Sequence, residues 1–226
     1  MSRIRIICPT RGRPERCRTM LESFFATRSS EEETKIFCYV ADDDPEIEAY
    51  KLLFETLAID HEFGPWKSLV DVINDAAGLF CMASDSADFV GEVNDDHVYR
   101  TIGWDLKLAE AIEKSGRGGL AYGKTENLPS AALISASCVR KLGWYHVPGF
   151  KHQFVDNALH DLYAGAGRLH YVPEVWIEHC HVDYGKAPMD ATYGIMRDTW
   201  NQGQARYSEW SQFEKQRDIE RLKACE

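Results

Sequence analysis

The chain lacks the features that mark membrane, secreted and disulfide-rich proteins. No apolar run in its 226 residues approaches the roughly 20 that a membrane-spanning helix needs. Residues 1–4 lack the apolar core and the cleavage site of a signal peptide. The seven cysteines are odd in number, widely spaced and without a CxxC pair, which argues against both a disulfide framework and a thiolate zinc site. We therefore expect a cytoplasmic protein without stable membrane insertion.

Several common catalytic and binding signatures are also missing. The sequence contains no Walker-type glycine-rich loop, no GxGxxG and no GxSxG elbow. It has no excess of positive charge, because its formal net charge is −10, and such a chain is a poor general binder of nucleic acid. Its first eighteen residues nevertheless hold six arginines, which are either a solvated face or a local site for a nucleotide.

Hydrophobic periodicity predicts an α/β protein. Short strands and longer helices alternate up to residue 114, a pattern typical of βαβ units and a mostly parallel sheet. The second half is more mixed, with two expected strands around Pro173, and from residue 190 the chain is polar and helical. The expected strands are 4–8, 35–40, 58–63, 88–93, 119–122, 131–135, 169–172 and 175–179. Without a repeat or a linker, residues 1–226 are expected to form one domain, with a core over about 3–190 and a helical tail over about 190–226.

Polar clusters follow three of these strands. They are Thr10–Arg13, Asp42–Asp44 and Asn94–Asp96. Ligands bind at the carboxyl ends of strands in open parallel sheets, so the three clusters predict one site. Each cluster has a simpler explanation as a turn or helix cap, above all Asp42–Asp44, because Pro45 suits the first turn of a helix.

The adjacent carboxylates of Asp95 and Asp96 predict a metal. Two neighbouring negative charges after a hydrophobic strand are costly unless a cation lies beside them. Mg²⁺ and Mn²⁺ prefer a few carboxylate oxygens together with phosphate oxygens of a substrate. Farther along, His179 and His181 would point to one face if the strand continued, and imidazole is a common ligand for borderline metals, so one of the two could complete the site. An aspartate-rich turn and a surface histidine pair are the alternatives.

The order of these motifs over residues 3–190 resembles the GT-A glycosyltransferases, particularly the family-2-like group. Residues 9–14 resemble the loop along the nucleotide, residues 40–44 the second-strand acidic motif, and Asn94–Asp96 the DxD motif, with Asn94 in place of its first aspartate. Residues 153–157 resemble the segment with the acidic base, although Val155 replaces the usual glutamate. Residues 177–181 resemble the late strand that supplies a metal-binding histidine.

The resemblance implies a single GT-A domain, a Rossmann-like sheet flanked by helices with a helical tail. Its implied activity is that of a metal-dependent, inverting glycosyltransferase (EC 2.4 class) using a UDP- or GDP-sugar. The acceptor would be a glycan, a lipid-linked sugar, a protein or a modified nucleobase, and the protein a possible homodimer. The implied donor-binding residues are Thr10, Arg11, Arg13, Asp42, Asp43, Lys67, Asn94 and Asp95, and the implied ligands of Mn²⁺ or Mg²⁺ are Asp96, His179 and His181.

The implied catalytic base is Asp156, with Asp161 as the alternative. Asp156 falls in the first turn of a helix, where the helix dipole is expected to lower the pKa of its carboxyl. Asp161 is five residues farther on and would point to a different face. Two other functions remain open from the sequence alone, a GT-A-fold nucleotidyltransferase and a non-catalytic module that binds a nucleotide or carbohydrate.

Overall fold

The computed structural model describes residues 2–83, 86–125 and 128–225, and its strands form one curled mixed sheet flanked by helices. The strands are β1 (Ile4–Thr10), β2 (Thr34–Ala41), β3 (Asp60–Gly64), β4 (Phe89–Glu92), β5 (His97–Tyr99), β6 (Leu120–Lys124), β7 (Leu133–Ser135) and β8 (Leu169–His179). The helices are α1 (Pro14–Thr27), α2 (Ile47–Leu57), α3 (Leu69–Met82), α4 (Trp104–Glu113), α5 (Ala136–Leu142), α6 (Val155–Gly165), α7 (Ala191–Asp198), α8 (Trp200–Phe213) and α9 (Lys215–Lys223). The predicted α/β class is confirmed.

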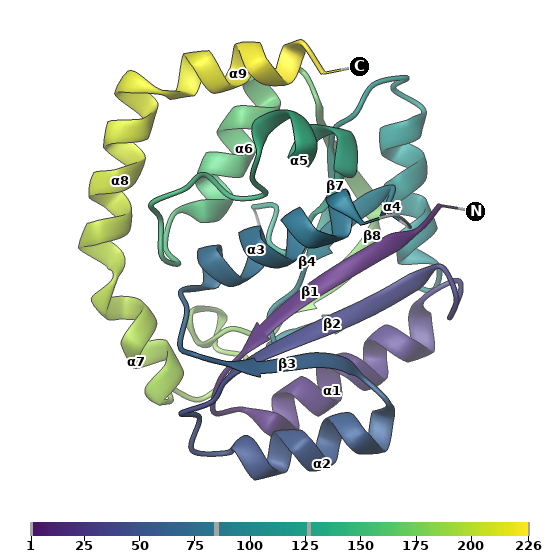
Figure 1. Cartoon of the computed structure of the whole chain (residues 1–226), viewed down its shortest axis with the longest axis vertical. Helices are drawn as coiled ribbons and strands as arrows, with labels where there is room; N and C mark the ends of the chain where they lie inside the picture. Colours follow the sequence, from purple (N-terminus) through teal and green to yellow (C-terminus); the bar gives the residue numbers. More distant parts are fainter. Residues whose placement is uncertain (1, 84–85, 126–127, 226) are drawn as a thin grey trace.

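The N-terminal half forms the parallel part of the sheet. Strands β3, β2, β1 and β4 lie in that order and pair in parallel, with Cys8 opposite Cys38 and Ile7 opposite Glu92. Figure 1 shows α1 and α2 below these strands and α3 above them. Since parallel strands end at the same edge, the loops after β1, β3 and β4 gather there.

The C-terminal half mixes strand directions. Strand β7 runs antiparallel to both β4 and β6, β8 runs parallel to β6, and β5 pairs antiparallel with β8. The sheet order is β3-β2-β1-β4-β7-β6-β8-β5. Strand β5 is absent from the strands predicted by periodicity, and its three residues, His97–Tyr99, follow the acidic motif directly.

The two strands predicted around Pro173 are one continuous strand, β8. Pro173 has no backbone N–H to donate, which normally interrupts a sheet ladder. Here the β6–β8 register is irregular, because Tyr122 pairs with Tyr171 whereas Lys124 pairs with Trp176. Pro173 therefore falls in a bulge, where a missing donor is tolerated.

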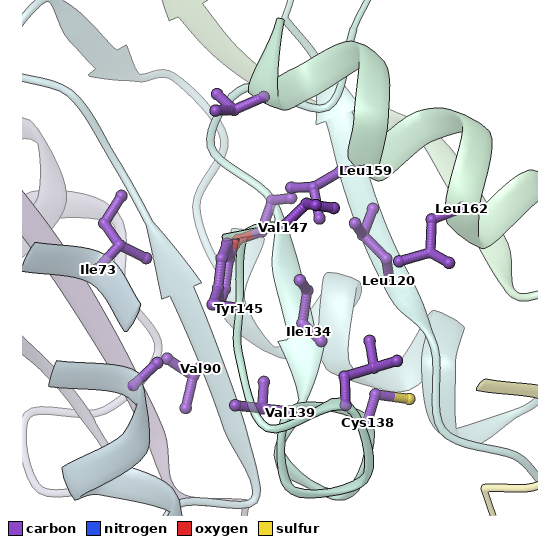
Figure 2. Close-up of a cluster of buried hydrophobic side chains, with 14 of the residues drawn as sticks. Ile73, Val90, Leu120, Ile134, Cys138, Val139, Tyr145, Val147, Leu159 and Leu162 are labelled. Carbon is purple, nitrogen blue, oxygen red and sulfur yellow. The ribbon is translucent and has the colours of Figure 1, made fainter. Parts of the chain in front are cut away.

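Two apolar clusters hold the sheet between its helices. Figure 2 shows part of the first, to which Val90 and Ile134 of the sheet and Leu159 and Leu162 of α6 belong. The second lies under α1 and α4 and includes Phe24 and Trp104, whose ring centroids are 5.8 Å apart. The buried Cys8, Cys17 and Cys38 belong to this second cluster.

The C-terminal helices, yellow in Figure 1, run along one side of the molecule and across the top of the view. Trp210 of α8 and Leu222 of α9 are fully buried and belong to the first core cluster. The guanidinium of Arg168 donates hydrogen bonds to the carbonyls of Lys223 and Cys225. The predicted tail is therefore packed against the rest of the chain. No helix within the described ranges combines the length and the apolarity needed to cross a lipid bilayer.

Candidate functional site

A cleft of about 890 Å³ opens at the carboxyl edge of the parallel strands. Its wall combines the loops after β1, β3 and β4, the start of α6, the end of β8, and the helices α7 and α8. The sequence-predicted residues that line it are Thr10, Arg11, Arg13, Lys67, Asn94, Asp95, Asp96, Asp156, His179 and His181. The edge predicted from strand polarity is thus the place where most of the candidate residues meet.

Asp95 lies on the buried side of the cleft. The Thr10 hydroxyl donates to Asp95 Oδ2 at 2.8 Å, and the Arg13 guanidinium donates to Oδ1 at 3.3 Å. Burial and the neighbouring Asp96 raise the pKa of Asp95 to about 7 against the opposing effect of Arg13. Asp95 therefore connects the loop after β1 to the acidic motif.

Asp96 faces two histidines. Ligand atoms of Asp96, His179 and His181 all lie within 4.8 Å of one another. Burial alone would raise the pKa of Asp96, but His179, His97 and the Tyr193 hydroxyl beside it hold that pKa well below its usual value. Asp96 is therefore a carboxylate at neutral pH, as a ligand of a hard divalent cation must be.

The donor set fits a divalent metal. Among the described residues, Asp96 Oδ1 and His179 Nε2 are buried without a hydrogen-bond partner, although they lie 3.3 Å apart. Buried polar atoms rarely stay unpaired, so two of them side by side point to a missing partner. One carboxylate oxygen and two imidazoles form a mixed set, because carboxylates suit Mn²⁺ and Mg²⁺ whereas imidazole suits the later divalent transition metals.

Strand pairing positions these histidines differently from the prediction. Strand β8 ends at His179, and His181 precedes a short 3-10 helix (Val182–Tyr184), so the two do not share a face of one strand. His179 instead pairs with His97 across β5 and β8, and their rings stack with centroids 4.2 Å apart. Burial lowers the pKa of His97 to about 3, so this ring is neutral.

The structure does not bring Asp42 and Asp43 into the cleft. Both are exposed, neither is among the described lining residues, and Asp43 forms an ion pair with Arg11 at 2.6 Å. The buried neighbour Asp44 accepts backbone hydrogen bonds from Gly12 at 2.9 Å and from Glu46 at 2.8 Å. Asp44 therefore connects the loop after β1 to the turn before α2, a local role of the kind that Asp and Pro also indicated in the sequence.

Of the two candidate bases, Asp156 lines the cleft and Asp161 does not. Asp161 accepts hydrogen bonds from Tyr207 at 2.7 Å and from Lys215 at 2.5 Å, which hold α6 against the C-terminal helices. Against the effect of burial, these donors lower the pKa of Asp161. Burial and the carboxylate of Glu92 raise the pKa of Asp156 to about 6, opposite to the lowering expected from the helix dipole. Desolvation at this position outweighs the dipole.

Sequence reasoning missed a buried pair beside Asp156. His146 Nε2 lies 2.7 Å from Glu92 Oε2, and both side chains are buried. Glu92 had a usable signal, because it is a charged residue inside a hydrophobic strand and such residues are seldom buried unless paired.

The C-terminal residues at the site gave no such signal. Asp190 and Tyr193 contact Arg13 and Asp96, from which they are separated by 177 and 97 residues in the chain. Nothing in the local sequence around them indicates this contact, because it depends on where the tail packs.

No protein-family model and no curated protein sequence matches the chain. Solved structures do match. A mannosyltransferase, PcManGT from Pyrobaculum calidifontis in complex with GDP-Man and Mn²⁺, superposes with a TM-score of 0.62 at 12% identity over 80% of this chain and 57% of that one. S. aureus TarS 1–349 in complex with UDP superposes with a TM-score of 0.60 at 12% identity over 78% of this chain and 60% of that one.

The chain has a GT-A-like fold. At this identity the likeness concerns the fold alone. The chain spans about three fifths of the length of these structures. A third match, S. aureus TarS 1–349 in complex with UDP-GlcNAc, has a TM-score of 0.59 at 12% identity.

Proposed function

We propose that the protein is a nucleotide-sugar-dependent, metal-dependent glycosyltransferase. The observation that carries the proposal is the cluster of Asp96, His179 and His181, which lies in the same cleft as the half-buried carboxyl of Asp156. A metal-ligand set and a carboxyl of raised pKa in one large cleft are features by which a catalytic site is recognised, and both can serve group transfer from a diphosphate.

Asp96, His179 and His181 are the proposed metal ligands. When bound, Mn²⁺ or Mg²⁺ would act as a Lewis acid that neutralises the charge of a diphosphate leaving group. The PcManGT structure was obtained with GDP-Man and Mn²⁺, which supports a divalent metal and a nucleotide-sugar donor for the same fold.

The proposed donor contacts line the same cleft. Thr10 ends β1, Arg11 and Arg13 follow it, Lys67 precedes α3, and Asn94 and Asp95 precede β5. Arg11 and Arg13 offer fixed guanidinium donors, the group best suited to phosphate oxygens. UDP- and GDP-sugars are the proposed donors, because neighbours of the same fold were solved with UDP, UDP-GlcNAc and GDP-Man.

Asp156 is the proposed general base of an inverting transfer. In that reaction a hydroxyl of the acceptor loses its proton to the base, its oxygen attacks the anomeric carbon, and the nucleoside diphosphate leaves from the opposite face. A pKa of about 6 suits a base that works near neutral pH, since it is ionised there yet more basic than an ordinary aspartate. Glycans, lipid-linked sugars, proteins and modified nucleobases remain the candidate acceptors.

The test measures donor binding and hydrolysis by the full chain against a panel of UDP- and GDP-sugars, with and without Mn²⁺. We expect one donor to raise the melting temperature in the presence of Mn²⁺ and to be slowly hydrolysed. Asp96→Ala should abolish the metal-stimulated hydrolysis, whereas Asp60→Ala, an exposed carboxylate at the start of β3, should not change it. Full metal-dependent hydrolysis in Asp96→Ala would refute the metal assignment.

A further inference from the structure

Helix α7 of the C-terminal segment reaches the proposed metal cluster through one side chain. Of the described residues of α7, Tyr193 alone is buried, with 1% of its surface exposed. It does not belong to either apolar core cluster. Its contacts are with charged and metal-ligating side chains, so its burial calls for an explanation other than hydrophobic packing.

The hydrogen bonds of the Tyr193 hydroxyl have a fixed direction. Arg16 Nη1 donates to this oxygen at 2.8 Å, and a guanidinium can only donate. The hydroxyl proton is then free to bond the carboxylate of Asp96, whose Oδ2 lies 2.9 Å away. Since a carboxylate only accepts, Tyr193 is the donor in this contact.

This bond determines which oxygen of Asp96 is available. Oδ2 is occupied by Tyr193, whereas Oδ1 has no hydrogen-bond partner among the described residues and faces His179 Nε2 at 3.3 Å. The hydroxyl therefore holds the carboxylate in the rotamer that presents Oδ1 to the two histidines.

The ring of Tyr193 contacts a second proposed ligand and a proposed donor contact. It meets the His181 ring edge-on, with centroids 4.5 Å apart and planes at 78°. The guanidinium carbon of Arg13 lies 3.8 Å from the ring centroid. One side chain thus touches Asp96, His181 and Arg13.

Asp190 holds α7 in this place. It caps the helix by accepting the backbone N–H of Tyr193 at 3.0 Å. It also accepts two hydrogen bonds from Arg13, from Nε at 2.9 Å and from Nη2 at 2.6 Å. This paired contact fixes the start of α7 relative to the loop after β1.

We infer that Tyr193 is a positioning residue of the metal site, which orients Asp96 by its hydroxyl and His181 by its ring. The inference rests on the proposed function, because it takes Asp96 and His181 as ligands. Partners of metal ligands typically contribute roughly 10–100-fold to metal affinity. Tyr193→Phe removes only the hydroxyl and keeps the ring, so it isolates the bond to Asp96.

The experiment titrates MnCl₂ into the full chain by calorimetry, once alone and once with UDP present. Tyr207→Phe is the matched control, because its hydroxyl also donates to a carboxylate, that of Asp161, but outside the cleft. We expect Tyr193→Phe to bind Mn²⁺ about 10-fold more weakly than wild type or worse, and Tyr207→Phe to bind it as wild type does. Melting temperatures without metal report on folding separately.

The two proposals fail in different ways. If wild type binds Mn²⁺ and Tyr193→Phe binds it equally well, the positioning role is wrong and the metal site stands. If wild type binds no Mn²⁺ with or without UDP, the metal assignment itself is wrong, and the role of Tyr193 is wrong with it.

A second variant keeps the test decisive if Tyr193→Phe folds poorly. Arg16→Met removes the donor to the hydroxyl oxygen, and with it the 3.8 Å ion pair from Arg16 to Asp190, but keeps the Tyr193 side chain itself. It should weaken Mn²⁺ binding, because the Tyr193 hydroxyl loses one of the two contacts that hold it beside Asp96. Unchanged affinity in Arg16→Met would overturn the orientation argument.

Discussion

At the scale of single residues, Asp156 and Asp161 lie on the same helix but have opposite surroundings. We expect Asp156→Asn to lower sugar transfer by ~10²–10⁴-fold, the range for losing general-base help, while donor affinity persists. Asp161→Asn should leave the rate of sugar transfer unchanged and lower the melting temperature, because it weakens the contacts to Tyr207 and Lys215. Transfer rates and nucleotide-binding constants of the two variants check this. The reverse pattern would move the base to Asp161.

The pH profile is the second measurement on Asp156. Its carboxyl has a raised pKa of about 6, so the basic form is present above that pH and is lost as the pH falls through it. Transfer should therefore rise with pH and level off above about 6. Burial is the largest cause of the raised pKa and the Glu92 carboxylate the next. Glu92→Gln removes that negative charge, so it should lower the pKa of Asp156 and shift the rise in transfer rate to lower pH. If the rise in transfer rate stays at the same pH in Glu92→Gln, the titrating group is not Asp156.

Residue type and motif order in the sequence are enough to predict the proposed metal ligands. Asp96, His179 and His181 follow or end expected strands, and their chemistry suggests a metal wherever the chain places them. The directions of pKa shifts could not be predicted in the same way. The helix dipole at Asp156 is visible in the sequence, whereas the burial that outweighs it depends on α6 packing beside Glu92. Asp42 and Asp43 show the converse, because they follow the correct strand end but are exposed outside the cleft, and Asp43 pairs with Arg11.

At the scale of elements, the bulge between β6 and β8 leaves no room at Gly123. A Cβ there would lie 2.7 Å from Val175 Cγ1 and 3.0 Å from the carbonyl carbon of Val175. Backbone cannot move aside as a flexible side chain does, so Gly123→Ala should lower the free energy of unfolding by about 1–3 kcal/mol. Urea-induced unfolding measures the change.

Gly78 is the matched control for this substitution. It lies inside α3, and a Cβ there would meet nothing within 4 Å. Gly78→Ala should raise the free energy of unfolding by roughly 0.5–1 kcal/mol, since alanine favours the helix and restricts the unfolded chain. Equal effects of the two substitutions would contradict the packing at the bulge.

Elements with a strong internal period could be predicted from the sequence, and elements that depend on a partner could not. The apolar stripe of α1 and the β-branched run of β1 each extend over seven or more residues, which is long enough for the pattern to predict a helix and a strand. Strand β5 has three residues and exists because β8 lies beside it. The continuity of β8 through Pro173 likewise depends on a bulge whose other side, β6, is about fifty residues earlier in the chain.

At the scale of the whole molecule, we propose that the chain unfolds as one domain with its C-terminal helices included. Trp210 is fully buried, and its indole N–H donates to Asp218 at 3.0 Å. Trp210→Ala should lower the free energy of unfolding by about 3–5 kcal/mol, the usual range for a large aromatic in a core. The entire chain should then melt in a single transition at a lower temperature. Circular dichroism in the far and near ultraviolet, followed through the same melt, checks for coincidence. Two separate transitions would instead divide the tail from the core.

The contact between Arg13 and Asp190 spans 177 residues, and it has a consequence for synthesis of the protein on the ribosome. Chains emerge N-terminus first at roughly 5–20 residues per second, and domains generally fold as units. Strands β1 to β4 therefore leave the ribosome while the arginine beside Asp95 still lacks its second carboxylate. The proposed metal cluster needs His179 and His181 as well, so a nascent chain cannot hold a cation through all three proposed ligands until these histidines have emerged. Premature termination before Asp190 would release a polypeptide that lacks Asp190 and Tyr193, the residues that contact Arg13 and Asp96.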